Sequence, residues 1–315
     1  MADWGSRAIW ESQAMAFSRR TFFWTAGGLL ALSGATAAYA RFVEPKWLDV
    51  TETEIQLPKM PIGKGVKLLH LSDFHASPEV PYSQIETAIR LGLERQPDLA
   101  CLTGDFITSR IRRIDQYLRL LRLLTDQVPT FACFGNHDRV NLSDGFKRFQ
   151  DNRQVGQLLD QSGIQLLFNQ HQSITVQGTP IEIVGVGDYL CRACRPESAF
   201  TGLNSSDRVV ILLSHNPDSK QMLDPYHWDL MLCGHTHGGQ LKIPFFGHRP
   251  FLSVAVTDQT LAEGLYPWKP AINQLTERYI FITRGVGNLM GARFNCRPEV
   301  SLLNLESTRL HQQVE

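Results

Sequence analysis

The stretch Val66-Lys-Leu-Leu-His-Leu-Ser-Asp-Phe-His75 joins an apolar run to two potential metal ligands. Its first part, residues 66–72, is a short and largely apolar run, which favours a buried β-strand. Asp73 and His75 follow immediately, where that strand is expected to end. The same order, an apolar run and then polar side chains, recurs along the chain. This stretch therefore sets the pattern for both the fold and the candidate site.

Short apolar runs alternate with amphipathic segments after this stretch. In the first half of the domain the sequence predicts strands at 66–72, 99–103 and 130–134, and helices at 83–95, 113–125 and near 155–161. Later segments are richer in strands, which are predicted at 174–176, 181–184, 208–213, 229–233, 279–283 and 300–305. Strand–helix alternation followed by strand-rich sequence indicates an α/β domain with stacked mixed sheets and helices on the outside.

Polar side chains follow several of these predicted strands. The segments are Asp73-Phe-His75, Gly104-Asp105, Gly135-Asn136-His137-Asp138, Ser214-His215 and Gly234-His235-Thr-His237. Each one alone is compatible with an ordinary turn. Because ligands of open α/β sheets collect at the carboxyl ends of the strands, all five together predict one shared site.

The residue types in these segments suit a pair of divalent metal ions. Carboxylates and neutral imidazoles together favour Mn²⁺, with Fe or Zn²⁺ as alternatives, over Ca²⁺. A carboxylate can bridge two ions because its oxygens carry several lone pairs. Two ions roughly 3.5–4 Å apart can stabilise the attacking and leaving oxygens of a phosphoryl transfer and lower the pKa of a water.

The order D-x-H, G-D, G-N-H-D, H, G-H-x-H resembles the signature of calcineurin-like metallophosphoesterases. The resemblance implies a four-layer α/β/β/α sandwich of two mixed β-sheets flanked by helices, spanning residues 66–306 with a tail at 307–315. It also implies a ligand set for two ions. The first ion would be held by Asp73, His75 and His237, the second by Asn136, His215 and His235, with Asp105 as the bridge.

The same resemblance implies roles outside the ligand set. His137 would contact the substrate phosphate or protonate the leaving oxygen, and Asp138 would orient His137. Asn136, His137 and Arg293 are the candidate substrate-binding residues. For Arg293 the guanidinium suits a phosphate, and an exposed arginine without that duty is the alternative.

Several further segments resemble a subgroup, the YaeI type of bacterial phosphodiesterase. They are Ser18-Arg19-Arg20, Glu44-Pro45-Lys46-Trp47, His237-Gly-Gly-Gln-Leu241 and the stretch from Arg284 to Glu299. The subgroup implies hydrolysis of a phosphodiester by metal-bound hydroxide. Some relatives are UDP-2,3-diacylglucosamine pyrophosphatases of lipid A synthesis, which is the alternative function. A catalytically inactive scaffold is disfavoured because no ligand of the signature is missing.

The N-terminal region is predicted to lie outside the catalytic domain. Residues 1–20 form a basic region, and the uncharged stretch 21–40 is interpreted as a signal anchor or a twin-arginine-like signal. Residues 41–65, with three prolines, are predicted to be a linker. Positive charge ahead of the apolar stretch predicts attachment to or passage through the bacterial inner membrane, with the domain in the periplasm. The lipid A alternative requires the cytoplasmic face.

Composition limits the partners. The chain has 315 residues, with 31 basic and 31 acidic side chains, so no overall positive field is available to attract nucleic acid. We infer a phosphate-ester substrate and no obligate protein partner. A lipid-linked substrate would suit the aromatics of Pro244-Phe-Phe-Gly247 and Trp268, although such aromatics are commoner in packing.

The remaining cysteine and histidine candidates have simpler interpretations. The six cysteines are interpreted as unpaired thiols, with a disulfide or soft metal site at Cys191 and Cys194 left open. His70 lies inside a predicted strand and is interpreted as a packed, hydrogen-bonded core histidine.

Overall fold

The structure is a computed structural model that describes residues 19–111, 113–138, 140–144, 147–205, 207–242, 261–269 and 277–308. Internal contacts divide the chain into two compact units, residues 1–39 and 40–315. Helix α1, Arg19–Phe42, begins in the first unit and ends in the second. In the described part of the chain, no helix is both long enough and apolar enough to cross a membrane.

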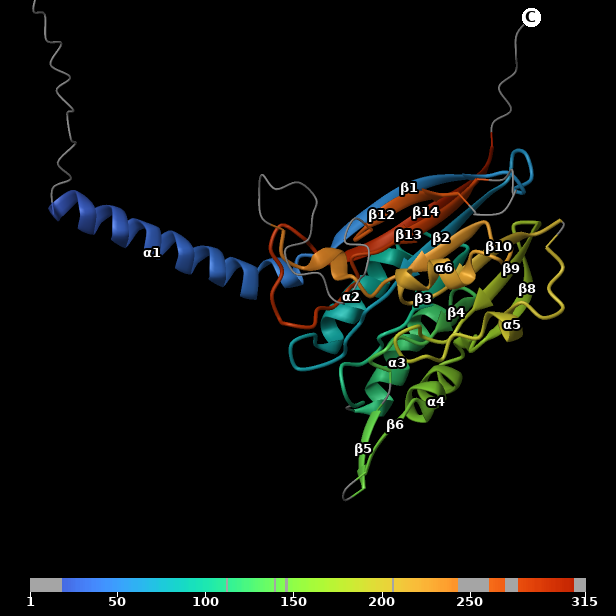
Figure 1. Cartoon of the computed structure of the whole chain (residues 1–315), viewed down its shortest axis with the longest axis horizontal. Coiled ribbons are helices and arrows are strands. Elements are labelled where there is room, and N and C mark those ends of the chain that lie inside the picture. Colours follow the sequence, from blue (N-terminus) through green and yellow to red (C-terminus); the bar gives the residue numbers. More distant parts are fainter. Residues whose placement is uncertain are drawn as a thin grey trace, which may run out of the picture. The chain divides into compact units, whose positions relative to one another are not determined.

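Two mixed six-stranded sheets form the centre of the second unit (Figure 1). The first has the order β1-β14-β2-β3-β4-β7, with strands Asp49–Leu57, Glu299–Ser307, Gly65–Leu71, Leu99–Thr103, Thr130–Cys133 and Gln165–Leu166. The second has the order β12-β13-β11-β10-β9-β8, with strands Gly264–Trp268, Arg278–Ile282, Leu230–Cys233, Val209–Leu213, Thr179–Gly185 and Gln170–Val176. In each sheet the strands that precede the polar segments run parallel.

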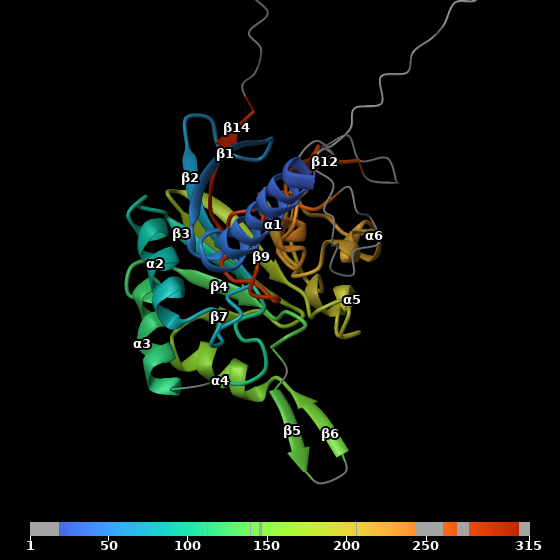
Figure 2. The same cartoon turned by 90° about the vertical axis from the view of Figure 1, so that its left-hand side faces the viewer.

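Helices cover the outer faces of both sheets. Figure 2 shows α2, α3 and α4 on the side of the first sheet and α5 and α6 on the side of the second. Their bounds are Tyr82–Leu93, Ile114–Thr125, Arg153–Gln161, Pro196–Ala199 and Lys220–Leu223, and the 3-10 turns η1, η2 and η3 are Glu44–Lys46, Pro217–Ser219 and His237–Gly239. The predicted four-layer α/β/β/α sandwich is confirmed.

The central strands of each sheet are buried on both faces, which explains their nearly continuous apolar sequences. In β2, Leu68 faces the core between the sheets, whereas Leu69 faces the core under the helices. In β10, Ile211 faces the core between the sheets and Leu212 faces the second helical layer. Side chains alternate between the two faces of a strand, so parallel strands covered on both sides need apolar residues at successive positions.

The segment 41–65 differs from the predicted linker, because it contributes a strand to the first sheet. Strand β1 pairs in parallel with β14 from Asp49–Glu299 to Leu57–Ser307. Its sequence alternates, with Ile55 and Leu57 buried and the intervening Gln56 exposed. That period of two is typical of a strand with one wet face. A further hairpin, β5 (Val140–Asp144) and β6 (Lys147–Asp151), was also not predicted.

Candidate metal centre

Loops at the carboxyl ends of β2, β3, β4, β10 and β11 bring the polar segments together, as the sequence predicted. The local backbone is unusual. Asp73, His75, Asp105, His235 and His237 all have positive φ values, between 45° and 67°. Non-glycine residues adopt this left-handed region at a cost of about 1–3 kcal/mol each. Packing around the loops therefore holds these side chains in place against a local preference for other conformations.

Two glycines explain how the loops approach so closely. A Cβ atom on Gly135 would lie 2.2 Å from Oδ1 of Asp105. A Cβ atom on Gly234 would lie 2.0 Å from Oγ of Ser72 and 2.2 Å from Oδ2 of Asp73. No side chain fits at either distance, so glycine before Asn136 and before His235 is a steric requirement.

The first ligand group consists of Asp73, His75 and His237, all fully buried, whose ligand atoms lie within 4.8 Å of one another. Nε2 of His75 and Nε2 of His237 are 3.1 Å apart. Nε2 of His237 is 3.4 Å from Oδ1 of Asp73. Buried imidazole nitrogens and a carboxylate that converge on one point form a donor set suited to a divalent ion.

The second ligand group consists of Asp105, His215 and His235, again buried and within 4.8 Å. Nδ1 of His215 donates to the carbonyl of Thr103 at 2.6 Å, which leaves Nε2 facing the group. Oδ1 of Asn136 is 3.1 Å from that Nε2, so the predicted amide ligand lies beside this group. A carbonyl that fixes the orientation of an imidazole in this way is typical of metal-binding histidines.

Asp105, the carboxylate of the second group, also faces the first group. Its Oδ2 is 3.3 Å from Nε2 of His75 and 3.2 Å from Nε2 of His215, one histidine from each group. Burial alone would raise the pKa of Asp105, but His215 and His75 hold that pKa well below its ordinary value. The carboxylate is therefore anionic and in the position of a bridge.

The histidines also fit a metal site chemically. Burial and the neighbouring His215 lower the pKa of His235 to about 4, so its imidazole is neutral. Its Nε2 is buried and has no hydrogen-bond partner among the described residues. A neutral imidazole with an unused buried nitrogen is the form that binds a metal. Together, the two buried groups are consistent with a dinuclear metal site.

His137 stands at the edge of this centre and is partly exposed. Its backbone N–H donates to Oδ1 of Asp105 at 2.8 Å. Its ring packs edge-on against His75, with the ring centroids 5.0 Å apart. Nδ1 of His137 is 3.2 Å from the carbonyl of Thr108, which accepts its proton. The imidazole is thus fixed by a backbone carbonyl.

Asp138 was predicted to orient His137, and the structure contradicts this role. Its carboxylate instead accepts backbone N–H groups of Asp105 at 2.9 Å, Phe106 at 2.7 Å and Gly135 at 2.7 Å. These bonds join the loop after β3 to the loop after β4. Asp138 therefore positions the backbone of the centre, while burial and the neighbouring Asp105 raise its pKa to about 8.

Arg293 was predicted either to bind substrate or to be exposed, and both expectations are wrong. The side chain is fully buried. Its guanidinium donates to the carbonyls of Gly287 at 2.6 Å and His237 at 3.2 Å, among other backbone oxygens. These bonds hold the loop between β13 and β14 against the loop that carries His237, which leaves no face of the guanidinium for a phosphate.

Asp188 is a residue of the centre that the sequence analysis missed. It is buried after β9, accepts the N–H of Cys191 at 2.8 Å through Oδ1, and has no described partner for Oδ2. Its charge favours the protonated forms of His215 and His235. The pair Gly187-Asp188 repeats the pattern of Gly104-Asp105, a Gly-Asp after a strand, and that repetition was the available signal.

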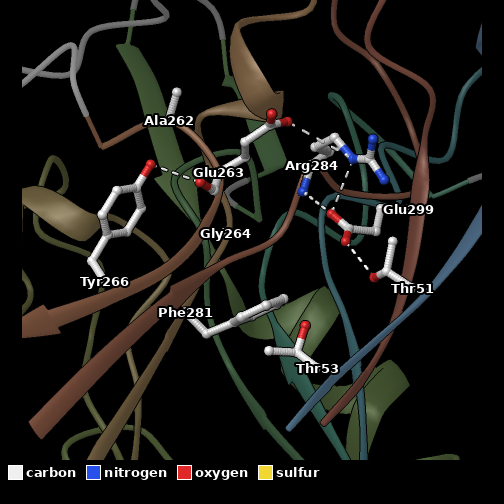
Figure 3. A pocket seen from close by; sticks show the side chains of 9 residues that line it. All are labelled: Thr51, Thr53, Ala262, Glu263, Gly264, Tyr266, Phe281, Arg284 and Glu299. Carbon is white, nitrogen blue, oxygen red and sulfur yellow. Dashed lines mark hydrogen bonds and ion pairs between the residues drawn. The ribbon is translucent and has the colours of Figure 1, made fainter. Parts of the chain in front are cut away.

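A cavity of about 450 Å³ is lined by residues of β1, β12, β13, β14 and the segments that flank them, among them Glu263, Arg284 and Glu299 (Figure 3). Arg284 lies on its wall and contacts Glu299 at 3.2 Å and Glu263 at 3.9 Å. A Cβ atom on Gly238, next to His237, would lie 2.7 Å from Cγ of Arg284, so this wall packs against the His237 loop. The candidate metal ligands are not among the residues that line the cavity.

Other expectations have mixed outcomes. His70 is a buried core histidine, as predicted, with Nε2 2.8 Å from Oγ1 of Thr103. None of the six cysteines, all of which lie in the described part of the chain, forms a disulfide. The predicted apolar residues 244–247 lie outside the described residues. Trp268 is partly buried and donates to Asp224 at 2.9 Å.

Comparisons with a family model and with individual proteins identify the same family. A family model described as calcineurin-like phosphoesterase matches residues 66–239. Phosphodiesterase YaeI of Escherichia coli strain K12 is 39% identical over 289 residues, which cover 91% of this chain and 99% of YaeI.

Two further relatives match over almost their whole length. The uncharacterized metallophosphoesterase YkuE of Bacillus subtilis strain 168 is 31% identical over 301 residues, covering 92% of this chain and 98% of YkuE. The UDP-2,3-diacylglucosamine pyrophosphatase LpxG of Chlamydia muridarum is 26% identical over 331 residues, covering 88% of this chain and 97% of LpxG.

Proposed function

Because this chain belongs to the calcineurin-like phosphoesterase family, we propose that it is a phosphodiesterase that uses two divalent metal ions. The observation that carries the proposal is the pair of buried ligand groups, with Asp105 facing histidines of both. The similarity to YaeI over nearly the full length of both chains supports a phosphodiester as the substrate class.

We assign the residues of the centre as follows. Asp73, His75 and His237 would hold one ion, Asn136, His215 and His235 would hold the other, and Asp105 would serve both. The mixed carboxylate and imidazole donors favour Mn²⁺, with Fe and Zn²⁺ as the competitors. When bound, two such ions supply charge neutralisation for the phosphoryl group and acidify a water.

His137 is the proposed acid. The Thr108 carbonyl occupies its Nδ1, so Nε2 is the nitrogen left for a substrate oxygen. Proton donation to the leaving oxygen from this atom would contribute about 10²–10⁴-fold. Asp138 keeps the His137 segment and the Asp105 loop in register through its three backbone hydrogen bonds.

A metal-exchange experiment tests the proposal. Purified protein is stripped with a chelator and assayed on a water-soluble bis-aryl phosphodiester, then titrated with Mn²⁺, Fe²⁺ and Zn²⁺. We expect no turnover after stripping and recovery that saturates at two ions per chain. Full activity in the stripped protein would refute the metal mechanism.

The pyrophosphatase activity named for LpxG is a second candidate, supported by the near-complete coverage of that relative. It uses the same centre on a glycolipid nucleotide. Assaying UDP-2,3-diacylglucosamine beside simple diesters and monoesters, with Mn²⁺ present, separates the two. A much higher kcat/KM for the glycolipid nucleotide would replace the diesterase proposal.

We further propose that residues 21–40 target the catalytic domain to the periplasmic face of the inner membrane. Support comes from Arg19-Arg20 ahead of the uncharged stretch, and from Ala38-Tyr39-Ala40 as a cleavage signal. Reporter proteins fused after Phe42 test this directly. A periplasmic reporter should be active and a cytoplasmic one inactive, and the opposite pattern would favour the lipid A alternative.

A further inference from the structure

Four large apolar side chains are exposed on two segments that hydrogen bonds join, residues 41–47 and the loop between β13 and β14. They are Phe42, Val43, Trp47 and Met290, with exposed fractions of 64%, 49%, 53% and 53%. We call them the apolar rim. Isolated exposed apolar residues are ordinary, but a cluster drawn from two distant chain segments marks an interaction surface.

Hydrogen bonds hold the two segments of the rim together. Nη1 of Arg41 donates to the carbonyl of Gly291 at 2.7 Å, beside Met290. Nε of Arg297 donates to the carbonyl of Trp47 at 3.1 Å, and its guanidinium lies 4.4 Å from the centre of the Trp47 ring. The backbone of both rim segments is therefore fixed by hydrogen bonds within the second unit, and its exposed side chains form part of the folded surface.

Positive charge lies on the same two segments. Arg41 and Lys46 are exposed. Arg297 is partly exposed and, like Arg284, pairs with Asp49, while Glu44 is buried. Tryptophan and other apolar side chains beside lysine and arginine match the interface of an anionic bilayer, with apolar contacts below and phosphate headgroups beside the cations.

The rim is close to the metal centre along one loop. Between β13 and β14, the N–H of Gly287 donates to the carbonyl of Asp73 at 2.7 Å. Met290 follows three residues later, and three residues span at most about 11 Å. The backbone of Met290 therefore lies no more than about 11 Å from that of Gly287, which contacts the backbone of Asp73 in the first ligand group.

We propose that the apolar rim docks the catalytic domain on an anionic lipid surface, so that the metal centre acts on phosphate at the level of the headgroups. The second half of this proposal rests on the phosphodiesterase function. Lipid is the occupant we favour because the rim directly follows the uncharged stretch 21–40, in which Phe23, Trp24, Leu30 and Leu32 are exposed on α1. Cleavage after Ala40 would leave the whole rim on the mature chain.

Vesicle flotation tests the docking. Full-length protein carrying Phe42→Ser, Trp47→Ser and Met290→Ser is compared with wild type on vesicles of phosphatidylcholine and phosphatidylglycerol in a 3:1 ratio. A matched control carries Ile62→Ser, Phe168→Ser and Met222→Ser, which removes exposed apolar side chains elsewhere. We expect the rim variant to lose about tenfold or more in partitioning, since binding follows buried apolar area and charge. Equal flotation of all three proteins would refute the docking surface.

Two substrates separate docking from catalysis. A p-nitrophenyl phosphodiester of dialkylglycerol in the same vesicles is compared with a water-soluble p-nitrophenyl diester. The rim variant should lose activity about tenfold on the vesicle substrate, in line with its lost partitioning, and keep its activity on the soluble one. Equal losses on both substrates would contradict the proposal. If the wild-type protein does not hydrolyse the soluble diester, the phosphodiesterase function is contradicted. The flotation assay would still test whether the rim binds lipid.

Discussion

The two ligand groups of the centre use similar side chains in different electrostatic surroundings. Beside the first group, Nη2 of Arg293 lies 3.4 Å from Nδ1 of His237. Burial, His75 and Arg293 together lower the pKa of His237 well below its ordinary value. Beside the second group lies the buried carboxylate of Asp188. Burial would lower the pKa of His215, but Asp105, Asp73 and Asp188 hold it well above its ordinary value.

This difference has a consequence for metal binding. A site with a nearby carboxylate attracts a cation more strongly than one with a guanidinium beside its ligand, because charges interact strongly in a buried environment. We therefore expect the second group to bind its ion more tightly than the first. Ligand identity alone does not set this order, since both groups contain a carboxylate and two histidines.

The largest effect is expected from Asp105→Asn, because both groups share this residue. Asparagine keeps the shape but removes the charge that lies 3.3 Å and 3.2 Å from His75 and His215. We expect kcat/KM on a soluble diester to fall by on the order of 10³-fold or more. Mn²⁺ titration should show weaker binding at both positions. If one ion still bound as in wild type, Asp105 would belong to a single group.

A smaller loss is expected from His137→Ala, since this residue belongs to neither group. Both ions should bind as in wild type, whereas kcat should fall by about 10²-fold, the lower end of the contribution of a general acid. The loss should be greatest for substrates with basic leaving groups, which most need a proton. A series of aryl diesters with leaving groups of different pKa measures this. A loss that does not vary across the series would leave His137 with a binding role only.

Patterns in the sequence predicted the central strands of both sheets, the helices of the first half of the domain and the six side chains that form the two buried groups, because strand periodicity and strand-end polar residues are local features. Roles that depend on backbone atoms were not predictable in this way. Asp138 accepts N–H groups and Arg293 donates to carbonyls, and neither pattern appears in side-chain identities. Strand β1 was missed because residues 51–54 are all polar, although the exposed Glu52, Glu54 and Gln56 alternate with less exposed residues, as is typical of an edge strand.

Asp188→Asn should alter the second group selectively. The substitution removes the charge, and the asparagine Oδ1 can still accept the N–H of Cys191. Loss of a supporting carboxylate commonly weakens metal affinity by about 10–100-fold, so the second ion should bind more weakly while the first is unchanged. Calorimetric titration with Mn²⁺ measures both steps. Asp160→Asn, on the exposed side of α4, is the control for a simple change in net charge. Unchanged affinities in Asp188→Asn would remove the electrostatic basis for the difference between the two groups.

The smallest effect is expected from His70→Gln, which alters the support of the second group from inside the core. His70 contacts Oγ1 of Thr103, whose carbonyl accepts the proton of His215 Nδ1. Burial lowers the pKa of His70 to about 3, so the folded protein keeps it neutral while the unfolded chain protonates it below about pH 6.5. Above pH 6.5 His70 is neutral in both the folded and the unfolded state and does not change the free energy of unfolding. As the pH falls from 6.5 toward 3, only the unfolded chain gains the proton, so the free energy of unfolding decreases. The slope approaches about 1.4 kcal/mol per pH unit.

Glutamine can keep the contact with Thr103 and does not titrate, so urea unfolding of the metal-free variant between pH 6.5 and 5 should show a slope shallower by that amount. An identical slope would mean that His70 gains a proton in the folded state, and the core support of the second group would then be weaker than its burial indicates.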